Sequence, residues 1–124
     1  MREIVQYGED DVTVRAIAGA DWLEVIETPQ TPNDLRSLGL GAGENAVLAW
    51  ALANPGTTVI LDEQCARRHA KNFGIPLRGT VGLILDAKRS GIVPEARSLI
   101  ERVRRAGLYV SDRLLQESLR VVGE

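Results

Sequence analysis

A short apolar run, TTVIL at residues 57–61, limits the possible folds more than any other feature of the chain. It follows a helix-stopping sequence, NPG at residues 54–56, and it ends in two adjacent acids, Asp62 and Glu63. Apolar runs of this length are typical of strands that are buried on both faces of a parallel sheet. Helical spacing resumes after Glu63, so the run predicts a strand followed by a helix, with the two acids at the junction.

Helices and extended segments alternate along the chain. We expect strands at residues 22–27 (WLEVIE) and 57–61, and an extended piece at 75–79. The expected helices lie at residues 11–20, 44–53, 63–73 and 81–89, with a helical turn at 34–38 and two further helices that begin at Pro94 and at Ser111. Thr80 is the expected N-cap of the helix at 81–89. Because helices separate the strands, the connections favour right-handed βαβ crossovers.

This alternation predicts an α/β fold, a three-layer α/β/α arrangement with a small parallel sheet, in a single domain that spans residues 1–124. A domain of this size removes roughly two thirds of its surface from water, so it can hold a core without disulfides or structural metals. Only 4% of the residues are aromatic, which means that aliphatic side chains dominate the packing. The segment at 46–53 is apolar all round and is therefore expected to form a buried helix.

Cysteine usage and hydropathy exclude several classes of protein. Cys65 is the only cysteine, which excludes an intramolecular disulfide framework. Cys65 and His69 share one helix face, but the chain has no further cysteine or histidine that could complete a tetrahedral zinc site. No apolar stretch is long enough to span a bilayer, and the N-terminus lacks a signal-peptide pattern. We therefore expect a cytoplasmic protein without a membrane partner.

Charge is distributed unevenly along the chain. Residues 1–63 carry 11 acidic and 3 basic residues, a net of −8, whereas residues 64–124 carry 12 basic and 6 acidic residues, a net of +6. Two interpretations stay open: solvated faces of opposite sign, or an acidic pocket with a basic rim that suits a polyanionic substrate. The densest basic cluster comprises Arg67, Arg68, Lys71, Arg78, Lys88 and Arg89.

Glu44 and Asp62 are the acids whose positions suggest a function. Each stands at the expected start of a helix, where Asp62 would be an ordinary N-cap, Glu63 a first-turn acid and Glu44 a partner of the helix dipole. Both helix starts are also expected at one edge of the sheet, so the two carboxylates could converge. Carboxylates held together repel each other unless a cation lies between them, and Mg²⁺ or Mn²⁺ takes such oxygen ligands. Capping and metal binding remain alternatives at this point.

Three segments resemble a known family: LGLGAGENAVLAWAL, VILDEQCARRHAKNFGIPLRGTVGLILDAKRSGIVP and the C-terminal GLYVSDRLLQESLRVVGE. They are similar to the PIN-domain-like family of predicted nucleic-acid-binding proteins related to VapC toxins. The resemblance covers residues 39–124, whereas residues 1–38 match only loosely. PIN relatives begin with a strand that bears an aspartate, and this chain lacks it. The resemblance therefore implies a PIN-like fold that is truncated at the N-terminus.

The resemblance also implies a ribonuclease site that uses Mg²⁺ or Mn²⁺ and draws its acids from separate segments of the chain. Carried over residue by residue, Glu3, Glu44 and Asp62 are the expected catalytic acids and metal ligands. Glu63 falls where relatives often have a second aspartate, and it is expected to assist in holding the ion.

The resemblance also implies the substrate side of the site. Arg67 and Arg68 are expected to contact RNA phosphate or to close the site, and Thr80 is expected near the same rim. The implied protein is a VapC-related, toxin-type, metal-dependent ribonuclease with an RNA substrate and a cognate antitoxin. We expect a homodimer, because a sheet without its central strand should pair with a partner. Because the first acidic strand is missing, two alternatives stand beside this ribonuclease: a catalytically inactive PIN-like module that binds nucleic acid or an antitoxin, and a small α/β domain whose acids only cap helices.

Overall fold

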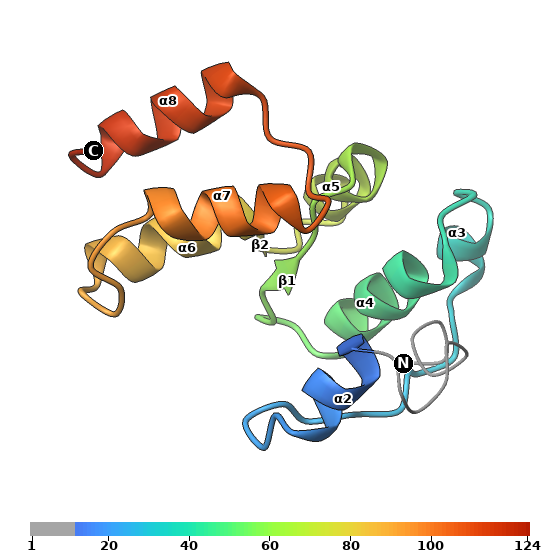
Figure 1. Cartoon of the computed structure of the whole chain (residues 1–124). Coiled ribbons are helices and arrows are strands. Elements are labelled where there is room, and N and C mark those ends of the chain that lie inside the picture. The colour runs from blue at the N-terminus through green and yellow to red at the C-terminus, as the bar shows by residue number, and fades with distance from the viewer. Residues whose placement is uncertain (1–11) are drawn as a thin grey trace. The chain divides into compact units, whose positions relative to one another are not determined.

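The computed structural model describes residues 12–124 and divides the chain into two compact units, Met1–Pro55 and Gly56–Glu124 (Figure 1). The described part of the first unit contains helices α2 (Val12–Ala18), α3 (Asn33–Arg36) and α4 (Ala42–Ala53). The second unit contains, in chain order, β1 (Val59–Ile60), α5 (Gln64–Asn72), β2 (Leu77–Arg78), α6 (Thr80–Arg89), α7 (Arg97–Arg105) and α8 (Asp112–Val121).

Helix α4 is the apolar helix that the sequence predicts, and it packs against α3 within the first unit. Leu35 of α3 is fully buried, and the buried positions of α4 are Leu48, Ala49 and Ala51. The helix begins at Ala42, before the predicted start at Glu44. Gly41 is the N-cap residue and has an extended backbone. The apolar composition of α4 is thus used to build the core of this unit.

Residues 22–27 (WLEVIE) do not form the predicted strand. They lie in a segment without regular secondary structure, where Trp22 is 80% exposed and Val25 is 61% exposed. An alternating pattern becomes a strand only where a neighbouring strand satisfies its backbone hydrogen bonds. The described part of the first unit contains no other strand that could do so.

The second unit contains a small parallel sheet. Strand β1 pairs with β2, with Val59 opposite Leu77. The pairing continues one residue past β1, where the N–H of Leu61 donates to the carbonyl of Arg78 at 2.9 Å. Helix α5 connects the two strands, so the predicted strand–helix–strand unit is confirmed, although each strand is shorter than expected.

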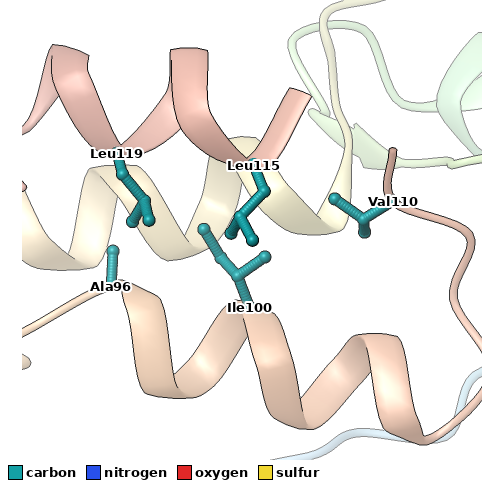
Figure 2. Close-up of a cluster of buried hydrophobic side chains, with 5 residues drawn as sticks. All are labelled: Ala96, Ile100, Val110, Leu115 and Leu119. Atoms are coloured by element: carbon teal, nitrogen blue, oxygen red, sulfur yellow. The ribbon is translucent and has the colours of Figure 1, made fainter. Parts of the chain in front are cut away.

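Helices α6, α7 and α8 surround the apolar core of the second unit (Figure 2). Leu115 and Leu119 of α8 point towards α7, where they meet Ile100 and the neighbouring Ala96. Val110, just before α8, closes the same cluster. Further aliphatic side chains that pack against the cluster are Val81, Ile84, Leu85, Leu108 and Val122. The helical spacing of apolar residues in the sequence accounts for this arrangement.

Helix α7 begins at Arg97, later than the predicted start at Pro94. The Glu124 carboxylate accepts hydrogen bonds from the N–H of Ala96 at 2.6 Å and from the N–H of Arg97 at 3.1 Å, and it thereby caps the helix. The bond from Ala96 is the main cause that lowers the pKa of Glu124 below its ordinary value. Lys88 donates to the carbonyl of Pro94 at 2.6 Å and lies 3.6 Å from the same carboxylate. Pro94 is therefore held in the loop before the helix.

These elements form an α/β fold with a small parallel sheet, as the sequence predicts. The expectation of one domain over residues 1–124 stays a prediction. Within residues 12–124, no helix is both long enough and apolar enough to cross a membrane.

Candidate functional site

The two acids that follow β1 stabilise the starts of two different helices. Glu63 is the N-cap of α5, and its carboxylate accepts hydrogen bonds from the N–H of Cys65 at 2.9 Å and of Ala66 at 2.7 Å. Both hydrogen bonds lower the pKa of Glu63 below its ordinary value, and the bond from Cys65 has the larger effect. The capping role expected for Asp62 is therefore filled by its neighbour, because an acid one residue later reaches the free amides of the first turn.

Asp62 contacts the start of α6, which lies 18 residues further along the chain. One carboxylate oxygen accepts the backbone N–H of Thr80 at 2.8 Å, and the other accepts the Thr80 hydroxyl at 2.5 Å. Strands β1 and β2 are parallel, so the residues that follow them meet at the same edge of the sheet. Asp62 thus joins the two strand ends and leaves its carboxylate exposed to solvent.

Thr80 is the first residue of α6, and Gly79 is the N-cap. The prediction that Thr80 caps this helix is therefore wrong by one position. The reason is that the side chain of Thr80 donates to Asp62 and does not accept from its own helix. Helix α6 receives its capping carboxylate from Asp62, at the end of a different strand.

Arg67 lies beside this contact. Its guanidinium donates to the carbonyl of Leu61 at 3.0 Å. A Cβ atom added to Gly79 would lie 2.5 Å from the same guanidinium and 3.1 Å from the Asp62 carboxylate. Asp62, Arg67, Gly79 and Thr80 therefore form one close cluster at the carboxyl ends of the two strands, named here the strand-end cluster.

The backbone of Gly79 does not itself require glycine, since its φ of −92° and ψ of 169° are open to other residues. Glycine leaves room for the end of the Arg67 side chain, which would have to move if a Cβ atom were present. Gly79 is a member of the cluster that the sequence pattern did not predict. The available signal was a glycine at the end of the expected extended piece, directly before a helix, since glycine there permits close approach of other groups.

Glu44 lies in the first turn of α4, as the sequence predicts. A Cβ atom at Gly41, the N-cap, would lie 2.5 Å from a carboxylate oxygen of Glu44, so the side chain folds back over the start of its helix. A carboxylate in this position interacts favourably with the positive end of the helix. Glu44 belongs to the first unit and Asp62 to the second. Glu3, the third expected acid, lies outside the described residues.

Several members of the basic cluster have partners within the second unit. The Arg78 guanidinium donates to both carboxylate oxygens of Asp86, at 2.9 and 2.5 Å, and Arg89 approaches the same carboxylate at 3.5 Å. Arg68 is exposed and lies 3.6 Å from the sulfur of Cys65. Arg78 and Arg89 are therefore already paired with an acid of the same unit.

A divalent ion such as Mg²⁺ or Mn²⁺ needs several oxygen ligands around it. Between residues 12 and 124, no group of three or more acidic, histidine or cysteine side chains is placed to hold a metal. A carboxylate has about four lone-pair sites, and the contacts with Thr80 use two of those on Asp62. The exposed carboxylate of Asp62 therefore fits a hard cation such as Mg²⁺ or Mn²⁺ as one ligand of a larger set. Glu63 is less free, because backbone amides already bind both of its oxygens.

A family model described as a PIN domain matches residues 1–124, the whole of the chain. The chain belongs to the PIN-domain family. Comparisons with curated proteins and with solved structures give no match. Membership in the family accounts for the parallel sheet with helices around it, and PIN domains have a nuclease-like fold and generally use divalent metal ions. This property of PIN domains agrees with an exposed aspartate at the carboxyl end of β1.

The structure brings together some of the residues that the sequence analysis selected. Asp62, Arg67 and Thr80 lie in the strand-end cluster, and Glu63 is adjacent to it in the chain. The roles of these residues in metal or RNA binding stay predictions. The convergence of Glu44 with Asp62 also stays a prediction.

Proposed function

We propose that this PIN-domain chain is a metal-dependent endoribonuclease that hydrolyses RNA phosphodiesters, of the toxin type related to VapC. The observation that carries the proposal is the position of Asp62 in a chain of this family. Its carboxylate is exposed, follows the end of a parallel strand and is oriented by two hydrogen bonds from Thr80. Ligands of open α/β sheets gather at this edge.

In this proposal Asp62, Glu44 and Glu3 hold a Mg²⁺ or Mn²⁺ ion, and Glu63 assists from the adjacent position. When bound, the ion would make a water molecule easier to deprotonate and would offset negative charge on the phosphate. The residues of the chain provide the hard oxygen ligands that such an ion prefers. Asp62 is the acid whose orientation the described contacts define best.

The distribution of charge supports an RNA substrate. The segment from residue 64 to residue 124, which forms most of the second unit, carries a net charge of +6. Arg68 and Lys71 are exposed on α5, the helix that begins directly after the two acids. Basic side chains around a phosphate-cleaving site bind the nucleic-acid backbone without selecting a sequence. Arg67 and Thr80 are the proposed contacts closest to Asp62.

We also propose the location, the inhibitor and the oligomeric state of the protein. A toxin-type ribonuclease is expected to be cytoplasmic, to be inhibited by a cognate antitoxin and to form a homodimer. Size-exclusion chromatography with light scattering measures the last of these, and a mass of twice 13.5 kDa is the expected result. A monomeric mass at high protein concentration would contradict the dimer without affecting the proposed chemistry.

The metal requirement is tested on the full chain with a panel of fluorescently labelled single-stranded RNAs. After treatment with EDTA, the protein should not cleave any of them, and added Mn²⁺ should restore cleavage. Glu44→Gln should lower the cleavage rate at saturating Mn²⁺, because it removes a proposed ligand. A protein that binds the RNAs but cleaves none of them with Mg²⁺ or Mn²⁺ would contradict the proposal and favour the inactive binding module.

A further inference from the structure

The Thr80 side chain makes a contact that capping of its own helix does not explain. Its hydroxyl donates to one oxygen of Asp62 while its backbone N–H donates to the other. The backbone bond alone would satisfy an amide at the start of α6. The hydroxyl adds a second fixed point, so the plane of the Asp62 carboxylate cannot rotate freely.

Arg67 lies close to the same place. Its guanidinium donates to the carbonyl of Leu61, and both this guanidinium and the Asp62 carboxylate lie near the Cα of Gly79. Any side chain at position 79 would meet Arg67 or Asp62. A residue with no side chain at this position therefore lets the strand end, the arginine and the start of α6 approach closely.

We propose that Thr80 is a positioning residue for Asp62, and that Gly79 and Arg67 maintain the spacing this requires. This inference rests on the proposed function, because it concerns how Asp62 presents its free lone pairs to a divalent ion. Thr80 acts through Asp62 and needs no contact with the ion itself. Groups that orient a metal ligand in this way typically change metal affinity by 10- to 100-fold when they are removed.

Thr80→Val and Thr80→Ser separate positioning from simple packing. Valine keeps the branched shape and the backbone N–H but removes the hydroxyl, whereas serine keeps the hydroxyl and removes a methyl group. The Thr80→Val protein should bind Mn²⁺ about 10- to 100-fold more weakly than the wild type, and Thr80→Ser should retain most of the affinity. Thr58→Val is the matched control, since Thr58 is exposed outside β1.

A second pair of variants tests the spacing. Gly79→Ala should weaken Mn²⁺ binding, because the new Cβ would displace the guanidinium of Arg67 or the carboxylate of Asp62. Gly82→Ala, in the same helix, should leave the affinity unchanged, because a Cβ there meets only ordinary contacts of 3.6 Å or more with Arg78. Circular dichroism would check that each protein is folded.

The measurement is the electron paramagnetic resonance signal of free Mn²⁺ during titration of the full chain, which reports binding without requiring RNA cleavage. Weakened binding in Thr80→Val with retention in Thr80→Ser supports the positioning role. Equal affinity of Thr80→Val and the wild type, combined with loss of binding in Asp62→Asn, overturns the role of Thr80 and leaves the proposed function standing. If the wild type itself binds no Mn²⁺, the proposed function fails and the role of Thr80 fails with it.

Discussion

Asp62 and Glu63 are neighbours in the sequence, but their carboxylates are used in different ways. Glu63 binds two amides of its own helix, whereas Asp62 reaches across to the helix that follows the next strand. The sequence predicts that acids follow a strand here and that one of them caps a helix. It assigns the cap of the helix at 63–73 to Asp62, whereas Glu63 makes it, because the choice depends on how β2 lies beside β1. That arrangement is set by contacts between residues that are distant in the chain.

Glu63 should contribute to the acid sensitivity of the fold. Because hydrogen bonds from Cys65 and Ala66 lower its pKa, its contribution is present above the ordinary glutamate pKa and is lost as the pH falls through the lowered value. The melting temperature of the wild type should therefore decrease between about pH 5 and about pH 3. Glu63→Gln should show a smaller decrease over the same range, as measured by circular dichroism.

The control for this experiment is Glu95→Gln, which changes an exposed glutamate outside the helices. It should show the full decrease of the wild type. Glu124 titrates in the same direction, because its pKa is also lowered, so some acid sensitivity should persist in the Glu63 variant. Identical pH profiles for the wild type and Glu63→Gln would contradict the capping role of this carboxylate.

At the scale of elements, helices are the best-predicted part of this chain. Helix α8 follows Ser111 as predicted, because the Ser111 side chain accepts the N–H of Leu114 at 3.1 Å and caps the first turn. The extended segments are less predictable, since pairing partners decide whether they become strands. The expected extended piece at 75–79 contains β2 (Leu77–Arg78), which pairs with β1, whereas residues 22–27 have no strand partner in the described part of their unit.

Removal of the cap of α8 should destabilise the second unit. Ser111→Ala is expected to lower the free energy of unfolding by about 1 kcal/mol, because the N–H of Leu114 loses its acceptor. Urea denaturation followed by circular dichroism measures the change. Ser90→Ala, at the exposed C-terminal end of α6, is the matched control and should change the free energy by less than about 0.5 kcal/mol. Equal effects of the two substitutions would show that the cap is not important.

The packing of α7 against α8 can be tested with two isoleucines. Ile100 is completely buried between these helices, and Ile92, in the loop before α7, is 76% exposed. Ile100→Ala should lower the free energy of unfolding by about 2–5 kcal/mol, because it removes buried methyl groups and leaves a cavity. Ile92→Ala should change it by less than about 0.5 kcal/mol. A small effect of Ile100→Ala in the same urea experiment would contradict the assigned core.

At the scale of the whole molecule, the sequence predicts the family, the fold class and most helices, but only part of the site. Asp62 and Thr80 were each selected from the sequence, yet their mutual contact depends on the pairing of β1 with β2. Gly79 was missed because its role is to leave space for Arg67, which is visible only when the strand ends are placed together. The proposed roles of Glu3 and Glu44 as metal ligands rest on the resemblance and on family membership.

The charge asymmetry predicts how RNA binding should respond to salt. In EDTA, which prevents cleavage, the affinity for single-stranded RNA should fall as salt increases, with a slope of about 0.7 per phosphate contact. The double variant Arg68→Ala/Lys71→Ala should bind more weakly and with a smaller slope, because both side chains are exposed on α5. Fluorescence anisotropy measures both quantities.

The control for RNA binding is Arg113→Ala, which removes an exposed arginine of α8 that pairs with Glu117. It should leave the slope closer to that of the wild type. If this variant reduces the slope as much as the double variant on α5, RNA binding is not localised near the strand-end cluster, and the proposed position of the substrate is wrong.

The most direct test of the central claim is the rate of RNA cleavage by Asp62→Asn at saturating Mn²⁺. Asparagine keeps an oxygen for the N–H of Thr80, so α6 should remain capped while the negative charge is lost. Asp21→Asn makes the same chemical change at an exposed turn of the first unit and serves as the control. The proposed site predicts that Asp62→Asn abolishes the Mn²⁺-dependent cleavage that the wild type and Asp21→Asn both show. Undiminished cleavage by a folded Asp62→Asn protein would contradict it.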